Sequence, residues 1–521
     1  MFFEMAGSCE YVTVYDIKSC YHQISMAPDH RKYLGFSWFL NGKVRYFIFK
    51  VVPFGICTGP SICKTIFRPL VVKWREEGIP TVLFFDDGVV GGNSFKACKK
   101  ASETVFKDLV LCHILPSAEK SCWEPKRSAE WLGHFWNCQE KVVSITEKRV
   151  EKFFERINSL ESSFPIISAR KVALVVGSLV SMILVFESKV LLHSRYLQTV
   201  INFREWEGLT WDSPIDIDAL DISQEIRKEV TFLKNNFHDM NKRSLVGEVA
   251  PHVTIFGDAG AEGVGGYKVV EGKKVEFHAP LPPDLVNTSS TERELYALYY
   301  ALHCFEKDVK FHKVVYITDS QCTDIICQKG SSKLNLQFWA IKIDEFCRKN
   351  NVKFYTAWTP RELNVEADEL SKFKDPDNWS VDRKLFLKAQ ILIQKEFTID
   401  IFASNMNTQC DRFYSRFACP NTLGVNAFKF CWIGEVCWLT PPPKLALKCV
   451  QHLKESCAQG VLLLPKWKSL HFWPMAGKFE PFLKGSWDFP GKNFLRNEHE
   501  SSVMGPKFRG AIVLLYYDFS I

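Results

Sequence analysis

The sequence has no Cys-x-x-Cys pair, although its 521 residues include 18 cysteines. Closely spaced cysteine pairs are typical of structural zinc sites, so we expect none here. The cysteines are scattered and no secretory leader follows Met1, which together predict a reducing intracellular compartment, either cytoplasm or nucleus. A long apolar run is also missing. The longest, 172–186, is interrupted by Gly177, Ser178 and Ser181 and falls short of the roughly 20 residues of a bilayer span. We therefore expect a buried helix there and no membrane partner.

Internal repeats and low-complexity tracts are absent too, so domain boundaries must come from changes of pattern. The 66 basic and 59 acidic residues leave a net charge of only +7, which permits nucleic-acid binding without requiring it. A chain of this length that is 46% hydrophobic can bury several separate cores. We expect an α/β and α+β multidomain protein.

Four changes of pattern divide the chain. Short β-rich runs separated by turns fill 1–140, and helical periodicity dominates 141–248. A new strand opens an α/β region over 249–376, and a charged, helical-looking linker follows over 377–396. The remainder, 397–521, is rich in Trp, Phe, Cys and Pro and contains a strand, loop, helix, strand pattern that predicts a second α/β domain.

Three aspartates mark the ends of β-rich runs in the first region. Asp16 ends YVTVYD, and Asp86 and Asp87 lie within TVLFFDDGVVGG. An isolated Asp-Asp pair is more often part of a hairpin turn. Two strands that end together would instead bring the three carboxylates side by side, and their repulsion would favour divalent metal ions. Two Mg²⁺ ions about 4 Å apart can activate a 3′-hydroxyl and stabilise a leaving pyrophosphate.

The runs YDIKSCYHQI, VPFGICTGPSICK and FFDD, in this order, resemble three palm motifs of retrotransposon reverse transcriptases. The resemblance implies that Asp16, Asp86 and Asp87 bind the metal ions. It also implies three kinds of substrate-binding residue. Tyr21 would be the aromatic that excludes a ribose 2′-hydroxyl, and Lys120 would be a cation near the triphosphate. The template grip would consist of Pro53, Phe54 and Gly55. Without the motifs, Tyr21 would be interpreted as a core aromatic and Lys120 as a solvated lysine.

The segment before the palm motifs departs from the family. Only fifteen residues precede Asp16 and none is Lys or Arg, whereas the family's fingers region supplies basic side chains that hold the triphosphate. We therefore expect a reverse transcriptase palm over 1–140 with truncated fingers, a helical thumb or connection over 141–248, and poor primer extension.

Four carboxylates lie at the ends of elements expected in 249–376: Asp258 and Asp319 on strands, Glu294 and Asp368 on helices. Each alone is more often a helix cap, a dipole partner or a solvated residue. Together GDAG, REL-x-AL, TDSQ and N-x-x-AD-x-LS resemble the ribonuclease H family. The resemblance implies that all four bind metal, and that two Mg²⁺ ions hydrolyse the RNA strand of an RNA–DNA hybrid. The family's mobile histidine is absent from 359–364, so we expect slower product release.

The tail adds a further resemblance. WTPRELNVEADELS followed by DIFASNMNTQCDRFYS and VLLLPKW is similar to DIRS-type retrotransposons, which integrate through a tyrosine recombinase. Residues 397–475 resemble phage-type adenine methyltransferases, whose loop of Asp or Asn, two prolines and an aromatic binds the flipped base. Here Thr440-Pro441-Pro442-Pro443 lacks both the acceptor and the stacking ring. We expect a methyltransferase-like domain over 397–521 that neither methylates nor binds S-adenosylmethionine.

Two functions remain open. The first is a retrotransposon RNA-directed DNA polymerase with ribonuclease H, whose expected partners are an RNA template, a DNA primer, an RNA–DNA hybrid and other element-encoded proteins such as a recombinase. The alternative is a catalytically decayed, nucleic-acid-binding remnant of a retroelement. The missing fingers favour the remnant, and the complete set of four carboxylates favours the enzyme.

Overall fold

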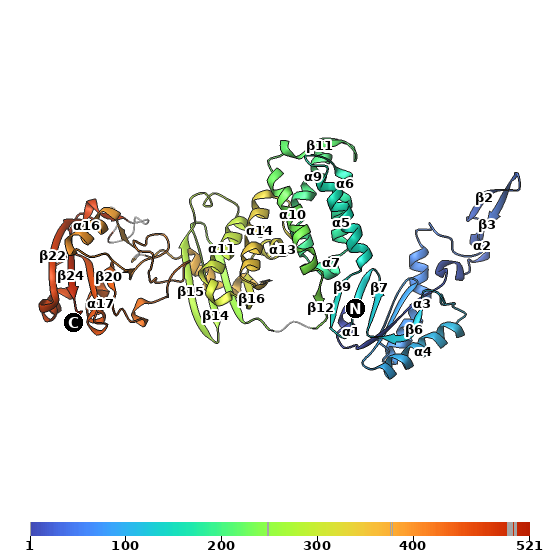
Figure 1. Ribbon diagram of the computed structural model, residues 1–521, viewed down its shortest axis with the longest axis horizontal. Coiled ribbons are helices and arrows are strands. Elements are labelled where there is room, and N and C mark those ends of the chain that lie inside the picture. The colour runs from blue at the N-terminus through green and yellow to red at the C-terminus, as the bar shows by residue number, and fades with distance from the viewer. Residues whose placement is uncertain are drawn as a thin grey trace. The chain divides into compact units, whose positions relative to one another are not determined.

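Two units divide the computed structural model, Met1–Val249 and Ala250–Ile521. The structure describes residues 2–246, 250–375, 377, 379–496, 504 and 508–520. The expected boundary at 248 and 249 lies outside the described residues, and so does residue 376 at the following boundary. Each unit combines sheets and helices, which confirms the expected mixed α/β multidomain fold (Figure 1).

The N-terminal unit contains an antiparallel sheet in the order β4-β5-β1-β6. Strand β1 pairs with β5 along its whole length, and a Cβ at Gly88 would lie 2.0 Å from the ring of Tyr15, so this pairing requires glycine. Two helices bury Phe67, Trp74 and Val105 against the sheet. The bounds are β1 Tyr11–Asp16, β4 Thr81–Phe84, β5 Asp87–Gly92, β6 Cys122–Lys126, α3 Gly59–Glu76 and α4 Phe95–Leu111.

A separate hairpin is inserted between β1 and α3. Its strands, β2 Gly35–Leu40 and β3 Lys43–Ile48, are exposed at every position. The short elements between β1 and this hairpin are η1 Cys20–Gln23 and α2 Pro28–Arg31, whereas α1 Phe2–Ala6 precedes β1 and lies beside β12 (Figure 1).

A second sheet, in the order β12-β9-β8-β7, runs across the expected boundary at residue 140, because β8 and β9 form one hairpin around it. A helical region follows, as the periodicity predicts. The bounds are β7 Ser128–Trp131, β8 His134–Asn137, β9 Val142–Ile145, α5 Glu147–Glu161, β10 Ile166–Ser168, α6 Ala169–Val180, α7 Ile183–Phe186, α8 Lys189–Leu192, α9 Arg195–Trp206, β11 Pro214–Asp216, η2 Ile217–Ala219, α10 Ser223–Met240 and β12 Arg243–Ser244.

The apolar run 172–186 forms α6 and α7 rather than one helix, with Ser181 and Met182 between them. Val172, Val175 and Leu179 are fully buried, as expected. Within the described part of the chain, no helix is long and apolar enough to span a membrane.

The C-terminal unit begins with a five-stranded sheet in the order β15-β14-β13-β16-β17. Strands β13, β16 and β17 are parallel, while β14 and β15 return as antiparallel hairpins. The bounds are β13 Val253–Ala259, β14 Gly263–Val270, β15 Lys273–Pro280, α11 Ser290–Cys304, α12 Glu306–Val309, β16 Lys313–Thr318, α13 Gln321–Lys329, α14 Leu334–Lys349, β17 Lys353–Trp358, η3 Arg361–Leu363 and α15 Val365–Lys372.

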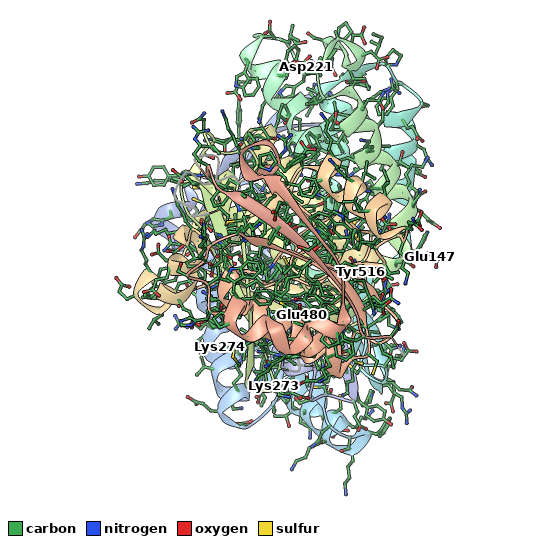
Figure 2. The ribbon with its side chains drawn as sticks, turned by 90° about the vertical axis from the view of Figure 1, so that its left-hand side faces the viewer. Glu147, Asp221, Lys273, Lys274, Glu480 and Tyr516 are labelled. Carbon is green, nitrogen blue, oxygen red and sulfur yellow. The ribbon has the colours of Figure 1, made fainter. Side chains whose placement is uncertain are left out.

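A second five-stranded sheet, β19-β20-β21-β24-β22, is parallel through β21 and antiparallel beyond it. Alternate residues of β21 point into two different cores, one that includes α17 and one that includes α16. Tyr516 on β24, labelled in Figure 2, belongs to the α16 core. The bounds are β18 Ser380–Val381, α16 Arg383–Ile393, β19 Ile399–Asp400, η4 Ala427–Lys429, β20 Val436–Leu439, η5 Pro443–Leu445, α17 Ala446–Glu455, β21 Gln459–Pro465, α18 Phe472–Ala476, η6 Gly477–Phe482, β22 Leu483–Pro490, η7 Gly491–Asn493, β23 Leu495–Arg496 and β24 Ala511–Asp518.

The segment expected as a linker, 377–396, is different in the structure. Helix α16 lies within it, and Leu385, Phe386 and Ala389 are buried in the second sheet's core. These side chains recur with helical spacing on one face, so burying them gains hydrophobic free energy that a linker would forgo. This segment is part of the C-terminal domain.

Candidate active site

Asp258 comes from a strand of the first C-terminal sheet, and Glu294 comes from helix α11, which packs against that strand. Asp258 lies near the end of β13, and its side chain is buried. Ser289 begins α11 by accepting a 3.2 Å hydrogen bond from the backbone N–H of Glu292. Glu294 follows just over one helical turn later and is only 7% exposed. The cap therefore fixes where the helix begins, and with it the position of Glu294.

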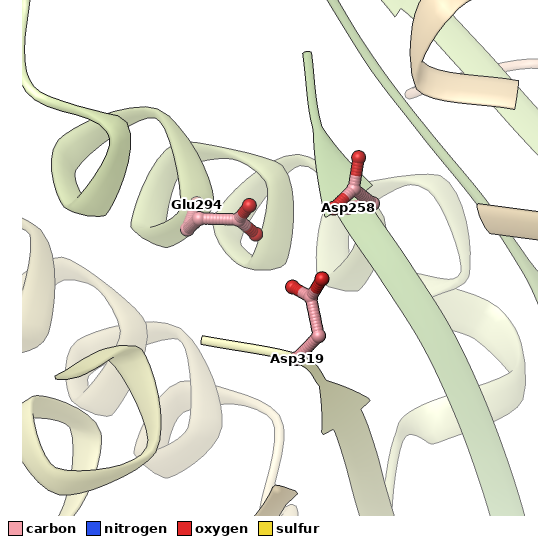
Figure 3. Close-up of side chains that lie close together, drawn as sticks. All are labelled: Asp258, Glu294 and Asp319. Atoms are coloured by element: carbon pink, nitrogen blue, oxygen red, sulfur yellow. The ribbon is translucent and has the colours of Figure 1, made fainter. Parts of the chain in front are cut away.

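Asp319 comes directly after β16, which runs parallel to β13 with Ile317 opposite Phe256. Because parallel strands end at the same edge of a sheet, Asp319 reaches the edge where Asp258 lies. One carboxylate oxygen from each of Asp258, Glu294 and Asp319 lies within 4.8 Å of the others. Figure 3 shows the three carboxylates converging from β13, α11 and the end of β16.

The surroundings make this cluster electrostatically unfavourable without a cation. Burial, followed by the charges of Asp258 and Asp319, raises the pKa of Glu294 well above its ordinary value. Burial also raises the pKa of Asp258, although a hydrogen bond from Ser371 opposes the effect. Oε1 of Glu294 accepts the backbone N–H of Ala259 at 3.3 Å, whereas its buried Oε2 has no hydrogen-bond partner among the residues that the structure describes. Three hard oxygen ligands with one unsatisfied oxygen fit a divalent ion such as Mg²⁺.

The fourth expected ligand, Asp368, lies on α15 but is not among the mutually close oxygens. Its Oδ1 accepts from Arg361 Nη2 at 2.8 Å, and its Oδ2 accepts from Lys372 Nζ at 2.5 Å. Helix α15 lies directly against β14, where a Cβ on Gly265 would come within 2.2 Å of the carbonyl carbon of Leu370. The structure thus brings three of the four carboxylates together and holds the fourth beside them with two cations.

Sequence reasoning missed two residues of this site. Ser371 Oγ donates a 2.6 Å hydrogen bond to Asp258 Oδ2 and so ties α15 to β13. Arg361 lies in the loop before α15, and its Nε is 4.0 Å from Asp319 Oδ2. Ser371 stands one helical turn after Asp368 within the motif that carries the resemblance, which was an available signal. Nothing local indicates the pairing of Arg361.

The palm aspartates also meet in the structure. Asp16 and Asp87 are paired across β1 and β5, and Asp86 lies in the two-residue turn between β4 and β5. Phe85, the other turn residue, has a φ of 56°, which is unusual for a bulky side chain and places both aspartates at the tip. The pKa of Asp87 is raised by burial and then by Asp86 and Asp16. Among the described residues, these three aspartates do not bring one oxygen each to within 4.8 Å of the other two.

The other expected palm residues surround the aspartates. Lys120 Nζ lies 3.2 Å from Asp16 Oδ2 and is 70% exposed. The half-buried Tyr21 ring packs edge-on against exposed Phe54 at 5.3 Å between centroids. Pro53 is buried beside it, and Gly55 has a φ of +92°, which favours glycine. Lys120 is thus the member of this group that forms an ion pair with an aspartate.

A cavity of about 490 Å³ opens in the C-terminal unit at the carboxyl ends of β19 and β20. Thr440 and Pro442 of the proline-rich loop line it, together with Phe402 and Phe428. The Thr440 hydroxyl donates to the Phe402 carbonyl at 3.5 Å, so it is engaged within the fold. The loop presents neither a carboxylate nor an aromatic ring at 440–443.

The first region of the chain matches one family model. Residues 2–135 match the family model "Reverse transcriptase (RNA-dependent DNA polymerase)". The chain therefore carries a reverse transcriptase domain, which confirms that part of the resemblance. No curated protein matches the sequence.

Three solved structures similar to the chain are of foamy viral protease–reverse transcriptase. The dRH form in complex with double-stranded DNA shares 14% identity at a TM-score of 0.38, covering 67% of this chain and 57% of its own. The complex with RNA/DNA hybrid shares 13% identity at a TM-score of 0.36, and the match covers 73% of this chain and 50% of that protein. Another complex with double-stranded DNA shares 12% identity at a TM-score of 0.37, and the match covers 67% of each chain. The chain thus spans 57% and 50% of the first two proteins.

Proposed function

We propose that this chain belongs to a retrotransposon RNA-directed DNA polymerase, and that its region 249–376 is a ribonuclease H that hydrolyses the RNA strand of RNA–DNA hybrids. The observation that carries the ribonuclease H assignment is the convergence of Asp258, Glu294 and Asp319 around the unpartnered, buried Oε2 of Glu294. Asp368 is proposed as the fourth catalytic carboxylate. RNA template, DNA primer and RNA–DNA hybrid are the proposed partners.

The chain's own groups prepare these carboxylates. The Ala259 N–H donates to Oε1 of Glu294, and the Ser371 hydroxyl donates to Oδ2 of Asp258, so both side chains are held in place beside Asp319. Bound Mg²⁺ would polarise a water molecule and neutralise charge on the scissile phosphate. The cluster itself favours a cation, because three carboxylates this close repel one another unless one is protonated or a cation lies between them.

The polymerase half rests on different observations. The match to the reverse transcriptase family supports a polymerase. The pairing of Asp16 with Asp87, next to Asp86, supports a site for divalent ions. We propose these three as metal ligands, Lys120 as a cation for the triphosphate, and Tyr21 with Pro53, Phe54 and Gly55 as substrate contacts. The palm is proposed to extend to residue 140, with a helical thumb or connection over 141–248.

The tail supports a narrower proposal. We propose a methyltransferase-like α/β domain over 397–521, of the kind found in DIRS-type elements, that does not methylate DNA. The supporting observation is that Thr440 and Pro442 line the cavity where that family places its base-binding groups, while 440–443 offers neither an acceptor carboxylate nor a stacking ring.

Cleavage of a labelled RNA–DNA hybrid in Mg²⁺ tests the proposal. The purified chain should cut the RNA strand, and Asp319→Asn should lower the rate by a factor on the order of 100 or more, because several kcal/mol of metal-dependent stabilisation would be lost. Asp284→Asn makes the same chemical change at an exposed position of the same unit and should cleave like the parent. Cleavage by neither the parent nor the control protein would favour the decayed, nucleic-acid-binding remnant.

A further inference from the structure

Asp368 differs from the other carboxylates of the site because both of its oxygens already have cationic partners. Arg361 Nη2 lies 2.8 Å from Oδ1, and Lys372 Nζ lies 2.5 Å from Oδ2. Asp258, Glu294 and Asp319 instead face one another, and Glu294 keeps an unsatisfied oxygen. A first divalent ion could therefore bind among these three without displacing a cation from Asp368.

Arg361 lies between Asp368 and Asp319, which belongs to the cluster of three carboxylates. Its guanidinium bonds Asp368, and its Nε lies 4.0 Å from Asp319 Oδ2. The charge of Asp258 also acts on it, after those of Asp368 and Asp319. An ion shared by Asp319 and Asp368 would need the same two carboxylates. One positive side chain thus occupies the space where a second positive ion would bind.

We propose that Arg361 is a positioning residue that holds the place of a second divalent cation between Asp319 and Asp368, and that it must move aside before that ion binds. The inference rests on the proposed ribonuclease H function of the same site. Its consequence is two unequal metal sites: a first ion bound by three buried or half-buried carboxylates, and a second ion whose apparent affinity is reduced by competition with the guanidinium.

The surroundings of Arg361 suit such a movement. Its side chain is 68% exposed and belongs to the short η3 turn, so the guanidinium can turn into solvent without leaving a cavity. Partly exposed ion pairs contribute only about 1 kcal/mol or less, so a divalent ion can replace this one. Lys372 binds the same carboxylate but has no contact with Asp319 among its ion pairs, so it should compete less strongly.

Binding of Mn²⁺ alone to the metal-stripped full chain, measured by the electron paramagnetic resonance of the unbound ion, tests the inference without any catalytic readout. Ions that disappear in Asp319→Asn are counted as ions of this site, because Asp319 belongs to both proposed positions, and this separates them from ions bound in the palm. The parent should bind one such ion tightly and a second weakly. Arg361→Gln should tighten the second by about threefold to tenfold, since one competing exposed ion pair has been removed.

Three comparison proteins sharpen the result. Arg361→Lys keeps the charge and should stay near the parent, whereas Lys372→Gln should tighten the second ion less than Arg361→Gln does. Lys274→Gln removes a lysine that pairs with Glu366 on the exposed surface near the β14–β15 turn, where Figure 2 labels Lys274, and should change nothing. The Mg²⁺ concentration that gives half-maximal hybrid cleavage should fall in Arg361→Gln in parallel with the Mn²⁺ affinity.

Failure of this inference and failure of the proposed function give different results. If Asp319→Asn removes bound Mn²⁺ but Arg361→Gln leaves the second dissociation constant unchanged, Arg361 does not hold the place of an ion, and the hydrolytic function stands. If Asp319→Asn removes no Mn²⁺ at all, the cluster binds no metal, and both the function and the inference are wrong.

Discussion

Replacing Glu294 by Gln should stabilise the metal-free C-terminal unit while weakening its response to metal. The side chain is buried, its Oε2 has no partner, and it faces two other acidic residues within 4.8 Å. Two unit charges at that separation repel by roughly 3.5 kcal/mol at an effective dielectric constant of about 20. Glutamine keeps the shape, removes the charge, and offers an N–H that Asp258 can accept.

The expected gain in the free energy of unfolding is smaller than that repulsion. The pKa of Glu294 is raised, so protonation of its carboxylate already relieves part of the repulsion. An unsatisfied buried polar group costs about 1–3 kcal/mol, and we expect Glu294→Gln to recover an amount in this range. For a unit of this size, each kcal/mol corresponds to about 2–4 °C in the unfolding midpoint.

The pH dependence of unfolding tests independently whether Glu294→Gln stabilises the protein. The folded-state pKa of Glu294 lies above its unfolded value of 4.5, so its contribution to stability is fully present below that pH and is lost as the pH rises through the folded pKa. Glutamine cannot titrate. The difference in stability between Glu294→Gln and the parent should therefore widen from a pH of about 4.5 upward and become constant above the raised pKa.

Thermal unfolding of both proteins, in chelator and in Mg²⁺, measures the effect. Mg²⁺ should raise the midpoint of the parent, since a ligand at 100 times its dissociation constant adds about 2.7 kcal/mol, and should raise that of Glu294→Gln much less. Glu306→Gln, an exposed position in the same unit, serves as the matched control. A lower midpoint for Glu294→Gln in chelator, or equal Mg²⁺ responses, would refute the reasoning.

Two further substitutions test how the candidate sites are built. Gly265→Val should cost about 1–3 kcal/mol in chemical denaturation and lower hybrid cleavage more than tenfold, because α15 lies within 2.2 Å of the added Cβ and carries Asp368 and Ser371. Gly477→Ala, where nothing lies within 4 Å, should do neither, and an unchanged Gly265→Val would contradict the account. In the palm, Asp16→Asn should reduce the low primer extension expected of the parent on an RNA template by a factor on the order of 100, whereas exposed Asp29→Asn should leave it unchanged; measurable extension that is equal in both variants would exclude Asp16 as a ligand.

The acidic cluster could be predicted because each member depends on a local pattern. Asp258 and Asp319 end apolar strands, and Glu294 follows a serine cap at the start of an apolar helix stripe. Once two strands are known to be parallel, their ends must meet at one edge of the sheet. Local periodicity and one topological rule are then sufficient to bring three side chains together.

The position of Asp368 could not be predicted in the same way. It depends on how closely α15 approaches β14, and Gly265 permits this close approach. It also depends on the ion pair with Arg361, and no local sequence pattern predicts which carboxylate the Arg361 side chain pairs with. The difference between the expected linker and helix α16 has another origin. The charged residues of 377–396 are typical of a solvated linker, whereas Leu385, Phe386 and Ala389 form one apolar face that is buried in the structure.

The two acidic sites share a physical arrangement that explains how the chain tolerates them without metal. In the palm, Lys120 pairs with Asp16; in the C-terminal unit, Arg361 pairs with Asp368. Both cations are long side chains about 70% exposed, so each neutralises a carboxylate from the solvent side at little cost when it leaves. A buried cation would neutralise more strongly but would also have to be removed from a low-dielectric position before a metal ion could enter. Exposed counter-ions therefore offset part of the negative charge at each site and leave the carboxylates accessible to divalent ions.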